Sequence, residues 1–252
     1  MKVLVTGAGA LLGQGIIRSL RESSLKVHVT ALDPSPLSAG LYWADDAHLI
    51  PMAADAEYLE AITALLRRLR PDALLIGTDV ELEILAVHRE DLESELGTKI
   101  IVSSPEVVRI ADDKYATFQF LRDHGFPHPR SCLPGEVDGL VEELGFPLIV
   151  KPRVGARSVG VHVVRDRDAL QRAIAEVHDP VIQEHVASAE VEYTAGALCF
   201  DGSVDATIVM RRDLRDGNTY RAYVDHFPEL NAQVRLLAEA LKPHGPANFQ
   251  FR

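Results

Sequence analysis

The first hundred residues of the chain alternate between short apolar runs and segments in which apolar residues recur every three or four positions. The runs predict strands and the segments predict helices. The predicted strands are 2–6, 27–32, 73–76 and 100–102, and the predicted helices are 12–20, 58–69 and 80–96. Because repeated strand–helix units pack with parallel strands and right-handed crossovers, this part of the chain predicts a Rossmann-like layer.

The pattern changes after Pro105, where we place a domain boundary. One or two helices are predicted over 106–124, and helices at 137–144 and 169–177 then alternate with strands at 148–151, 161–164 and 181–185. From Val191 onward the chain is rich in strands, predicted at 193–200, 206–210, 220–224 and 248–251, with one helix over 234–241. We therefore expect an α/β protein with a Rossmann-like domain over 1–105 and an α+β domain over 106–252.

Composition and charge exclude several classes of protein. The 26 Lys and Arg residues against 37 Asp and Glu give a net charge of −11, which opposes binding to the phosphate backbone of nucleic acids. No apolar run approaches the roughly 18–20 residues of a membrane span, and the N-terminus lacks the features of a signal peptide. Two distant cysteines, Cys132 and Cys199, show no metal-ligand spacing. We expect a soluble cytoplasmic protein with no nucleic-acid or membrane partner.

A glycine cluster after the first predicted strand allows two interpretations. Gly7, Gly9 and Gly13 lie between a strand and a helix, where backbone N–H groups can hold an anion. Asp33 ends the second strand, where dinucleotide-binding folds place an acid, so the arrangement indicates an NAD(P) site. The same glycines, spaced G-x-G-x-x-x-G, also suit a tight strand-to-helix turn that binds no ligand.

Acidic residues follow the third predicted strand, in the segment 78–83. One interpretation makes them part of an acceptor-substrate pocket, because α/β folds bind ligands at this edge of the sheet. We favour the other, in which Thr78 or Asp79 caps the following helix and the acids occupy its first turn.

The stretch LIVKPRVGARSVGV, at 148–161, is the most informative of the chain. Lys151 ends an apolar strand, and a loop with Gly155, Ser158 and Gly160 follows. Such glycines let main-chain N–H groups approach phosphate oxygens, while the lysine and the serine add a cation and a hydroxyl donor. Upstream, Lys114 stands at a predicted helix start, which a cation disfavours, so we expect it to bind an anion.

The order of motifs along the chain resembles the ATP-grasp superfamily. The motifs are Asp-Lys at 113–114, Lys-Pro and Gly-Ala-Arg-Ser-Val-Gly-Val within 151–161, Gln-Glu-His-Val at 183–186, Glu-Tyr-Thr at 192–194 and Gly-Pro-Ala-Asn-Phe-Gln-Phe-Arg at 245–252. Within that superfamily the chain is most similar to ligases that resemble the large subunit of carbamoyl phosphate synthase. The resemblance implies a pre-ATP-grasp domain over 1–105 and an ATP-grasp domain over 106–252. The latter would have a lid subdomain over about 125–186 and an incomplete C-terminal subdomain over 187–252.

The resemblance implies a phosphate site. Lys114 and Lys151 match the two lysines that hold the phosphates of ATP. The residues that match the flexible loop over the phosphates are Gly155, Ser158, Val159 and Gly160. In this family the glycine-rich N-terminal turn does not bind NAD, which favours the structural interpretation of that turn.

The resemblance also implies roles around the rest of the nucleotide. Glu184 and Val186 match the linker whose main chain meets adenine, and Glu192 matches the acid that binds ribose. Gln250 matches a position beside the magnesium ion. Arg211 stands where a basic residue would face the transferred phosphoryl group.

One departure from the family pattern concerns the metal. In the family a Glu-x-Asn-Pro-Arg strand follows and carries the magnesium carboxylate, but the sequence ends at Arg252. Mg²⁺ prefers charged oxygen ligands in octahedral geometry, so Gln250 alone is a poor site. We therefore expect the sequence to be part of a longer polypeptide. The 252 residues alone would keep nucleotide binding and lack an adequate metal site.

The function implied by the resemblance is that of an ATP-dependent carboxylate–amine or ammonia ligase that uses ATP and Mg²⁺. A carboxylate would attack the γ-phosphate, and an amine or ammonia would capture the resulting acylphosphate. The substrates would be small molecules, and the oligomeric state stays open, with a homodimer as one candidate. Two alternatives remain: an NAD(P)-dependent oxidoreductase built on the first glycine cluster and Asp33, and a non-catalytic nucleotide-binding module.

Overall fold

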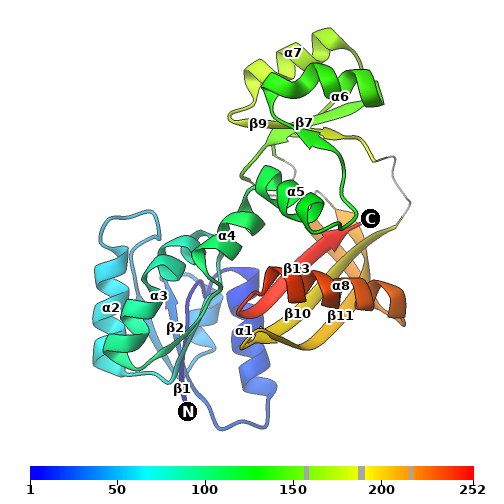
Figure 1. Ribbon diagram of the computed structural model, residues 1–252. Coiled ribbons are helices and arrows are strands. Elements are labelled where there is room, and N and C mark those ends of the chain that lie inside the picture. Colours follow the sequence, from blue (N-terminus) through cyan, green and yellow to red (C-terminus); the bar gives the residue numbers. More distant parts are fainter. Residues whose placement is uncertain (156–158, 187–190, 216–217) are drawn as a thin grey trace. The chain divides into compact units, whose positions relative to one another are not determined.

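The computed structural model describes residues 1–155, 159–186, 191–215 and 218–252, and it divides the chain into two units, Met1–Val108 and Arg109–Arg252 (Figure 1). Each unit has buried apolar clusters of its own. None of the described helices combines the length and the apolar character that a membrane crossing requires.

A five-stranded parallel sheet forms the centre of the first unit. Its order is β3-β2-β1-β4-β5. The bounds are β1 (Lys2–Val5), β2 (His28–Asp33), β3 (Asp46–Leu49), β4 (Ala73–Leu75) and β5 (Lys99–Ile101). Four of these strands confirm the prediction. The sequence analysis missed β3, because this edge strand is mostly exposed and has no apolar run to identify it.

Three helices cover the two faces of this sheet. They are α1 (Leu11–Glu22), α2 (Tyr58–Leu69) and α3 (Leu82–Leu96). Figure 1 shows α2 and α3 on one face and α1 on the other. Side chains along β1 alternate accordingly, since Leu4 packs with the α2 and α3 cluster whereas Val3 and Val5 pack with Ile17 of α1. Because both faces of the sheet are buried, the sequences of the central strands are continuous apolar runs.

The first glycine cluster forms a closed turn between β1 and α1. Gly7 has a φ of 57°, and a Cβ on Gly13 would lie 2.1 Å from the Gly7 carbonyl oxygen, so both positions require glycine. The carboxylate of Asp33 accepts hydrogen bonds from the Gly9 amide at 2.7 Å and the Ser38 hydroxyl at 2.5 Å. Asp33 therefore stabilises the turn itself, as the structural interpretation of this cluster expects.

The acidic segment after β4 agrees with the expectation in part, because its acids occupy the first turns of the helices that follow, but no side chain caps those turns. Thr78 is the N-cap of a short 3₁₀ turn, η2 (Asp79–Glu81), but its side chain makes no capping bond. Its hydroxyl donates instead to Glu81 at 2.5 Å, and this carboxylate also accepts from Thr6 and from the Tyr58 phenol, both at 2.6 Å. Glu81 is only 4% exposed, so these three hydroxyls replace the water that its carboxylate would otherwise bind. Burial of the Tyr58 phenol and the negative charge of Glu81 raise the pKa of Tyr58.

The second unit begins with α4 (Pro105–Asp112), which spans the division, and α5 (Lys114–Asp123). A four-stranded antiparallel sheet of order β6-β9-β7-β8 follows, with α6 (Val137–Leu144) and α7 (Arg167–Glu176) packed on it. Its strands are β6 (Ser131–Cys132), β7 (Leu148–Pro152), β8 (His162–Val164) and β9 (Pro180–Glu184). Two further 3₁₀ turns are η1 (Ala39–Tyr42), in the first unit, and η3 (Pro134–Glu136).

A second antiparallel sheet, of order β12-β11-β10-β13, completes this unit. Its strands are β10 (Glu192–Phe200), β11 (Ser203–Arg215), β12 (Asn218–Val224) and β13 (Gly245–Phe251). Helix α8 (Pro228–Leu241) packs on one face, where Val234 and Ala238 join a buried cluster that includes Ala195 and Val209. The other face carries polar side chains of β10, β11 and β13, which pair across the strands.

Candidate functional site

Lys114 is the first residue of α5. Its ammonium Nζ donates to the main-chain oxygens of Gly155 at 2.7 Å and Arg153 at 3.1 Å, so the side chain lies against the end of β7. Burial lowers the pKa of Lys114 below its ordinary value. An anionic oxygen is a stronger acceptor for an ammonium group than a neutral carbonyl oxygen is. The Lys114 ammonium is therefore suited to bind an anion.

Lys151 lies on β7, and its Nζ donates to the side-chain oxygen of Gln183 on β9 at 2.6 Å. Burial, together with the positive charges of Lys114 and Arg252, lowers the pKa of Lys151 to about 8. The two lysines are therefore close enough to repel each other. The structure brings together the two cations that the sequence analysis assigned to phosphate binding.

The described ends of the glycine-rich loop have backbone conformations that favour glycine. Gly155 has a φ of 139° and Gly160 a φ of 70°, a region that other residues rarely adopt. Val159 is 74% exposed, so the loop does not bury it in a core. Ser158, which was expected to add a hydroxyl donor, lies outside the described residues.

The adenine linker proposed from the sequence begins at the end of β9. The Glu184 amide donates to the main-chain oxygen of Arg130 at 2.8 Å, and the Glu184 carboxylate accepts from the Arg130 amide at 3.0 Å. Glu184 thus fixes the end of β9 to the segment before β6. Val186 follows the end of that strand, and its side chain is exposed.

Glu192, expected at the ribose, forms the centre of a charged group on the polar face of the second sheet. Its Oε2 accepts from Arg212 at 3.1 Å, and its Oε1 accepts two bonds from Arg252. Arg212 also donates to the Gln250 side chain at 3.1 Å and to Thr219 at 3.3 Å. The Arg212 side chain is only 10% exposed, and its buried Nε has no partner within the described part of the chain.

Arg211 does not join this group. It pairs in register with Tyr193, on the α8 side of the sheet, and its guanidinium lies 4.2 Å above the Tyr223 ring and 3.1 Å from Asp213. Because successive strand residues point to opposite faces of the sheet, the Arg212 side chain lies on the polar face, opposite to that of Arg211. Arg212 was not among the site residues expected from the sequence, and the role expected for Arg211 at the transferred phosphoryl group stays a prediction.

The described residues do not form a magnesium site. The amide oxygen of Gln250 accepts from the guanidinium of Arg212, so a cation already lies beside it. In the described ranges, no group of three or more His, Cys, Asp or Glu side chains is arranged to hold a metal ion. Mg²⁺ needs hard, preferably charged oxygen ligands, and Gln250 in this setting offers one neutral oxygen next to a positive charge.

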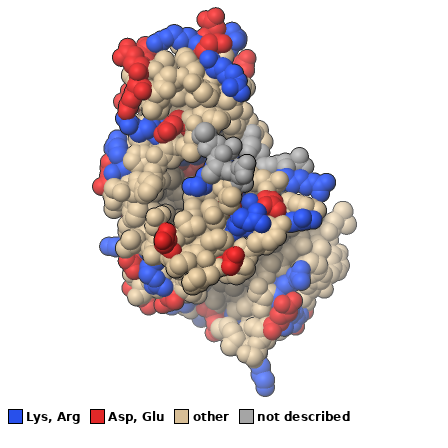
Figure 2. Space-filling model, turned by 90° about the vertical axis from the view of Figure 1, so that its right-hand side faces the viewer, with Lys and Arg blue, Asp and Glu red and all other residues tan. Residues whose placement is uncertain are grey.

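The electrostatic character of the site differs from that of the whole chain. The net charge of the chain is −11. Figure 2 shows Lys and Arg side chains gathered near the centre and right of the face turned to the viewer. At the site, Lys151 lies near Lys114 and Arg252, and the main carboxylate partner of Arg252 is Glu192. A cluster of cations of this kind is suited to a highly charged anion.

Comparison with known proteins identifies both parts of the chain. Residues 3–101 match the family described as PylC-like, N-terminal domain, and residues 111–226 match the family described as ATP-grasp domain. The carbamoyl phosphate synthase large chain of Methanosarcina barkeri is 24% identical to this chain over 281 residues, which cover 99% of this chain and 26% of that protein. The phosphoribosylamine–glycine ligase of Streptomyces coelicolor is 34% identical over 187 residues, which cover 73% of this chain and 42% of that protein.

The fold is also that of solved structures. The crystal structure of N5-carboxyaminoimidazole synthetase from Staphylococcus aureus complexed with ADP has a TM-score of 0.75 at 16% identity, and the match covers 99% of this chain and 66% of that one. These matches confirm the predicted resemblance and the predicted fold, and they give no support to the NAD(P) interpretation. The chain spans only 20% of the carbamoyl phosphate synthase large chain of Methanosarcina mazei and 26% of that of Methanosarcina barkeri.

Proposed function

We propose that this chain, which carries an ATP-grasp domain behind a PylC-like N-terminal domain, binds ATP and acts as an ATP-dependent carboxylate–amine ligase. The observation that carries the proposal is the pair of buried ammonium groups of Lys114 and Lys151. Among the described residues, their hydrogen-bond partners are carbonyl and amide oxygens rather than carboxylates. Two adjacent cations with neutral partners are the arrangement that a polyphosphate would complete.

The reaction would have two steps. A substrate carboxylate oxygen bonds to the γ-phosphorus of ATP, the bond to the β-phosphate oxygen breaks, and ADP leaves. The nitrogen of an amine or ammonia then bonds to the acyl carbon of the acylphosphate, inorganic phosphate leaves, and the nitrogen loses a proton. In this scheme the lysines bind and orient the phosphates and neutralise their charge, and the loop that begins at Gly155 excludes water.

The remaining residues would hold the nucleoside. A carboxylate has about four acceptor positions, and the described contacts of Glu192 use three of them. The position left on Oε2 is available for a ribose hydroxyl. The main chain near Glu184 and Val186 would meet the adenine edge. Because the described residues do not fit Mg²⁺, we assign the ion no protein ligand and expect it to be held by the nucleotide phosphates.

Calorimetry with ADP and with NADH tests the proposal. We expect the chain to bind ADP and to show no heat of binding with NADH. Lys151→Ala should weaken ADP binding at least tenfold, because one charge-assisted contact is lost. The matched control is Lys26→Ala, which removes an exposed lysine of the first unit and should leave ADP affinity unchanged. Equal ADP affinity in Lys151→Ala and Lys26→Ala would refute the site.

A second assay separates a ligase from a non-catalytic nucleotide-binding module. The chain is incubated with MgATP, a panel of small carboxylates and hydroxylamine, which traps an acylphosphate as a hydroxamate. A ligase gives ADP and hydroxamate in equal amounts with at least one carboxylate. ADP binding without any carboxylate-dependent ADP release would favour the module.

A further inference from the structure

We propose that Arg153 is a positioning residue, which clamps the start of α5 to the end of β7 and so holds the Lys114 ammonium beside Lys151. This inference rests on the proposed function, in which Lys114 binds phosphate. The described contacts of the Arg153 side chain are with Asp113, Asp179 and the Tyr115 ring. Its effect on the nucleotide would pass entirely through the position of Lys114.

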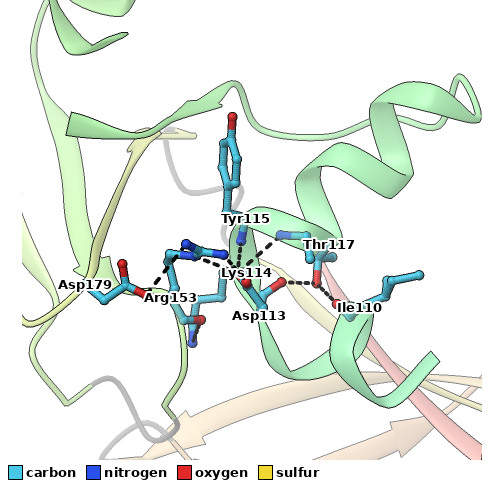
Figure 3. A network of polar contacts seen from close by, with 8 residues as sticks. Ile110, Asp113, Lys114, Tyr115, Thr117, Arg153 and Asp179 are labelled. Atoms are coloured by element: carbon cyan, nitrogen blue, oxygen red, sulfur yellow. Dashed lines mark hydrogen bonds and ion pairs between the residues drawn. The ribbon is translucent and has the colours of Figure 1, made fainter. Parts of the chain in front are cut away.

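The first half of the clamp is the carboxylate of Asp113, the N-cap of α5. Its Oδ1 accepts from the amides of Tyr115 at 2.8 Å and Ala116 at 3.2 Å, which fixes the first turn of the helix. The same carboxylate receives both Nε and Nη2 of Arg153, with Nε 3.2 Å from Oδ1 (Figure 3). Asp113 and Arg153 are mostly buried, with side chains 13% and 28% exposed, so the pair is little screened by water.

The second half of the clamp is the main chain of Arg153. Its carbonyl oxygen accepts from the Lys114 amide at 3.0 Å and from the Lys114 Nζ at 3.1 Å. Its amide donates to the Asp179 carbonyl at 3.1 Å, and its guanidinium lies 3.7 Å from the Asp179 carboxylate. Figure 3 shows Arg153 between Asp179 and the start of α5. One residue therefore joins the helix, β7 and the segment that leads into β9.

The clamp opposes a repulsion. Lys114 and Lys151 are close enough for one charge to lower the pKa of the other, and a lysine side chain released from its contacts gains freedom by moving into water. If the guanidinium is removed, Asp113 still caps α5, but the helix start loses its bidentate link to β7. The main-chain oxygens that accept from the Lys114 ammonium are then no longer fixed to the helix start by the side chain of Arg153, whereas Lys151 keeps its contact with Gln183.

The test compares ADP with adenosine, which lacks phosphates, by calorimetry on the 252-residue chain. In Arg153→Gln we expect ADP affinity to fall about tenfold and adenosine affinity to stay unchanged, because only the phosphate contact is disturbed. Arg153→Lys keeps the charge without the planar fork and should recover part of the ADP affinity. Asp113→Asn should reproduce the selective loss, and its combination with Arg153→Gln should add little.

The matched control is Arg167→Gln, which breaks an exposed ion pair with Asp138 in the same unit and should alter neither affinity. Wild-type ADP affinity in Arg153→Gln, or equal losses for ADP and adenosine, would overturn the inference. Asp113→Asn and Arg153→Lys provide the same comparison if Arg153→Gln does not fold. A wild-type chain that prefers ADP no more than adenosine would instead refute the proposed phosphate site, whatever the variants show.

Discussion

The low pKa of Lys151 predicts that nucleotide binding weakens as the solution becomes alkaline. Burial, with Lys114 and Arg252 nearby, lowers this pKa from 10.5 to about 8. At pH 7 about 90% of the Lys151 side chains are protonated, and at pH 9 about 10% are. If the phosphates bind the protonated form, ADP affinity should fall about tenfold between these two pH values. A lysine with its ordinary pKa would give almost no change over this range.

Calorimetry in two buffers with different ionisation enthalpies measures the protons exchanged on binding. A bound polyphosphate favours the charged lysine, so we expect the uptake of about half a proton per ADP at pH 8. Lys151→Arg is the decisive variant, because its guanidinium stays charged at pH 9 and its affinity should depend much less on pH. A wild-type affinity that is flat from pH 7 to 9, or an equal pH dependence in Lys151→Arg, would refute the reasoning.

Three further predictions concern stability and are measured as the free energy of unfolding in urea. Lys151→Met should stabilise the nucleotide-free chain by about 1–2 kcal/mol at pH 7. The folded pKa of Lys151 lies below the unfolded one, so charging this lysine opposes folding below pH 8, and the gain should shrink as the pH rises from 8 to 10.5. Tyr58→Phe should destabilise by about 1–2 kcal/mol, since it removes one donor from the buried Glu81, and unchanged stability would exclude that role. Gly13→Ala should cost about 2–3 kcal/mol, because its Cβ would lie 2.1 Å from the Gly7 oxygen, and a neutral result would contradict the close packing of this turn.

Helix positions were predictable where the apolar periodicity and the residues that end a helix indicate the same bounds. The predicted bounds 58–69 and 137–144 coincide with α2 and α6. Each has regular apolar spacing, and α6 ends at Gly145, whose φ is 68°. At α7 a capping residue outside the apolar pattern explains the error. Helix α7 begins at Arg167 rather than residue 169 because the Asp166 side chain accepts from the Ala169 amide at 2.7 Å and so caps an earlier turn.

Strand lengths were less predictable than helix lengths. The apolar run predicted 206–210, but β11 extends from Ser203 to Arg215. Its second half is charged and follows no apolar alternation, and it is a strand because it pairs with β10 and β12. Pairing of this kind depends on residues far away in the sequence, so local composition does not reveal it.

The same limit applies to the candidate site. Lys114 and Lys151 could be proposed from the sequence because each is marked locally, one at a helix start and one at the end of an apolar strand before a glycine loop. Only the register of β11 against β10 shows that Arg212 lies on the polar face with Glu192 and that Arg211 lies on the opposite face. Arg153 lies within the recognised motif, but its partner Asp113 is 40 positions away, and only the fold shows that they meet.

The crowding of like charges around Lys151 has a consequence for the lifetime of the protein. If an anionic nucleotide binds only the folded chain and relieves this repulsion, its presence at a hundred times the dissociation constant would add about 2.7 kcal/mol to the stability of the folded form by mass action. The unoccupied molecule would then open more often and be cut first by proteases. The durability of this protein would then follow the supply of its ligand.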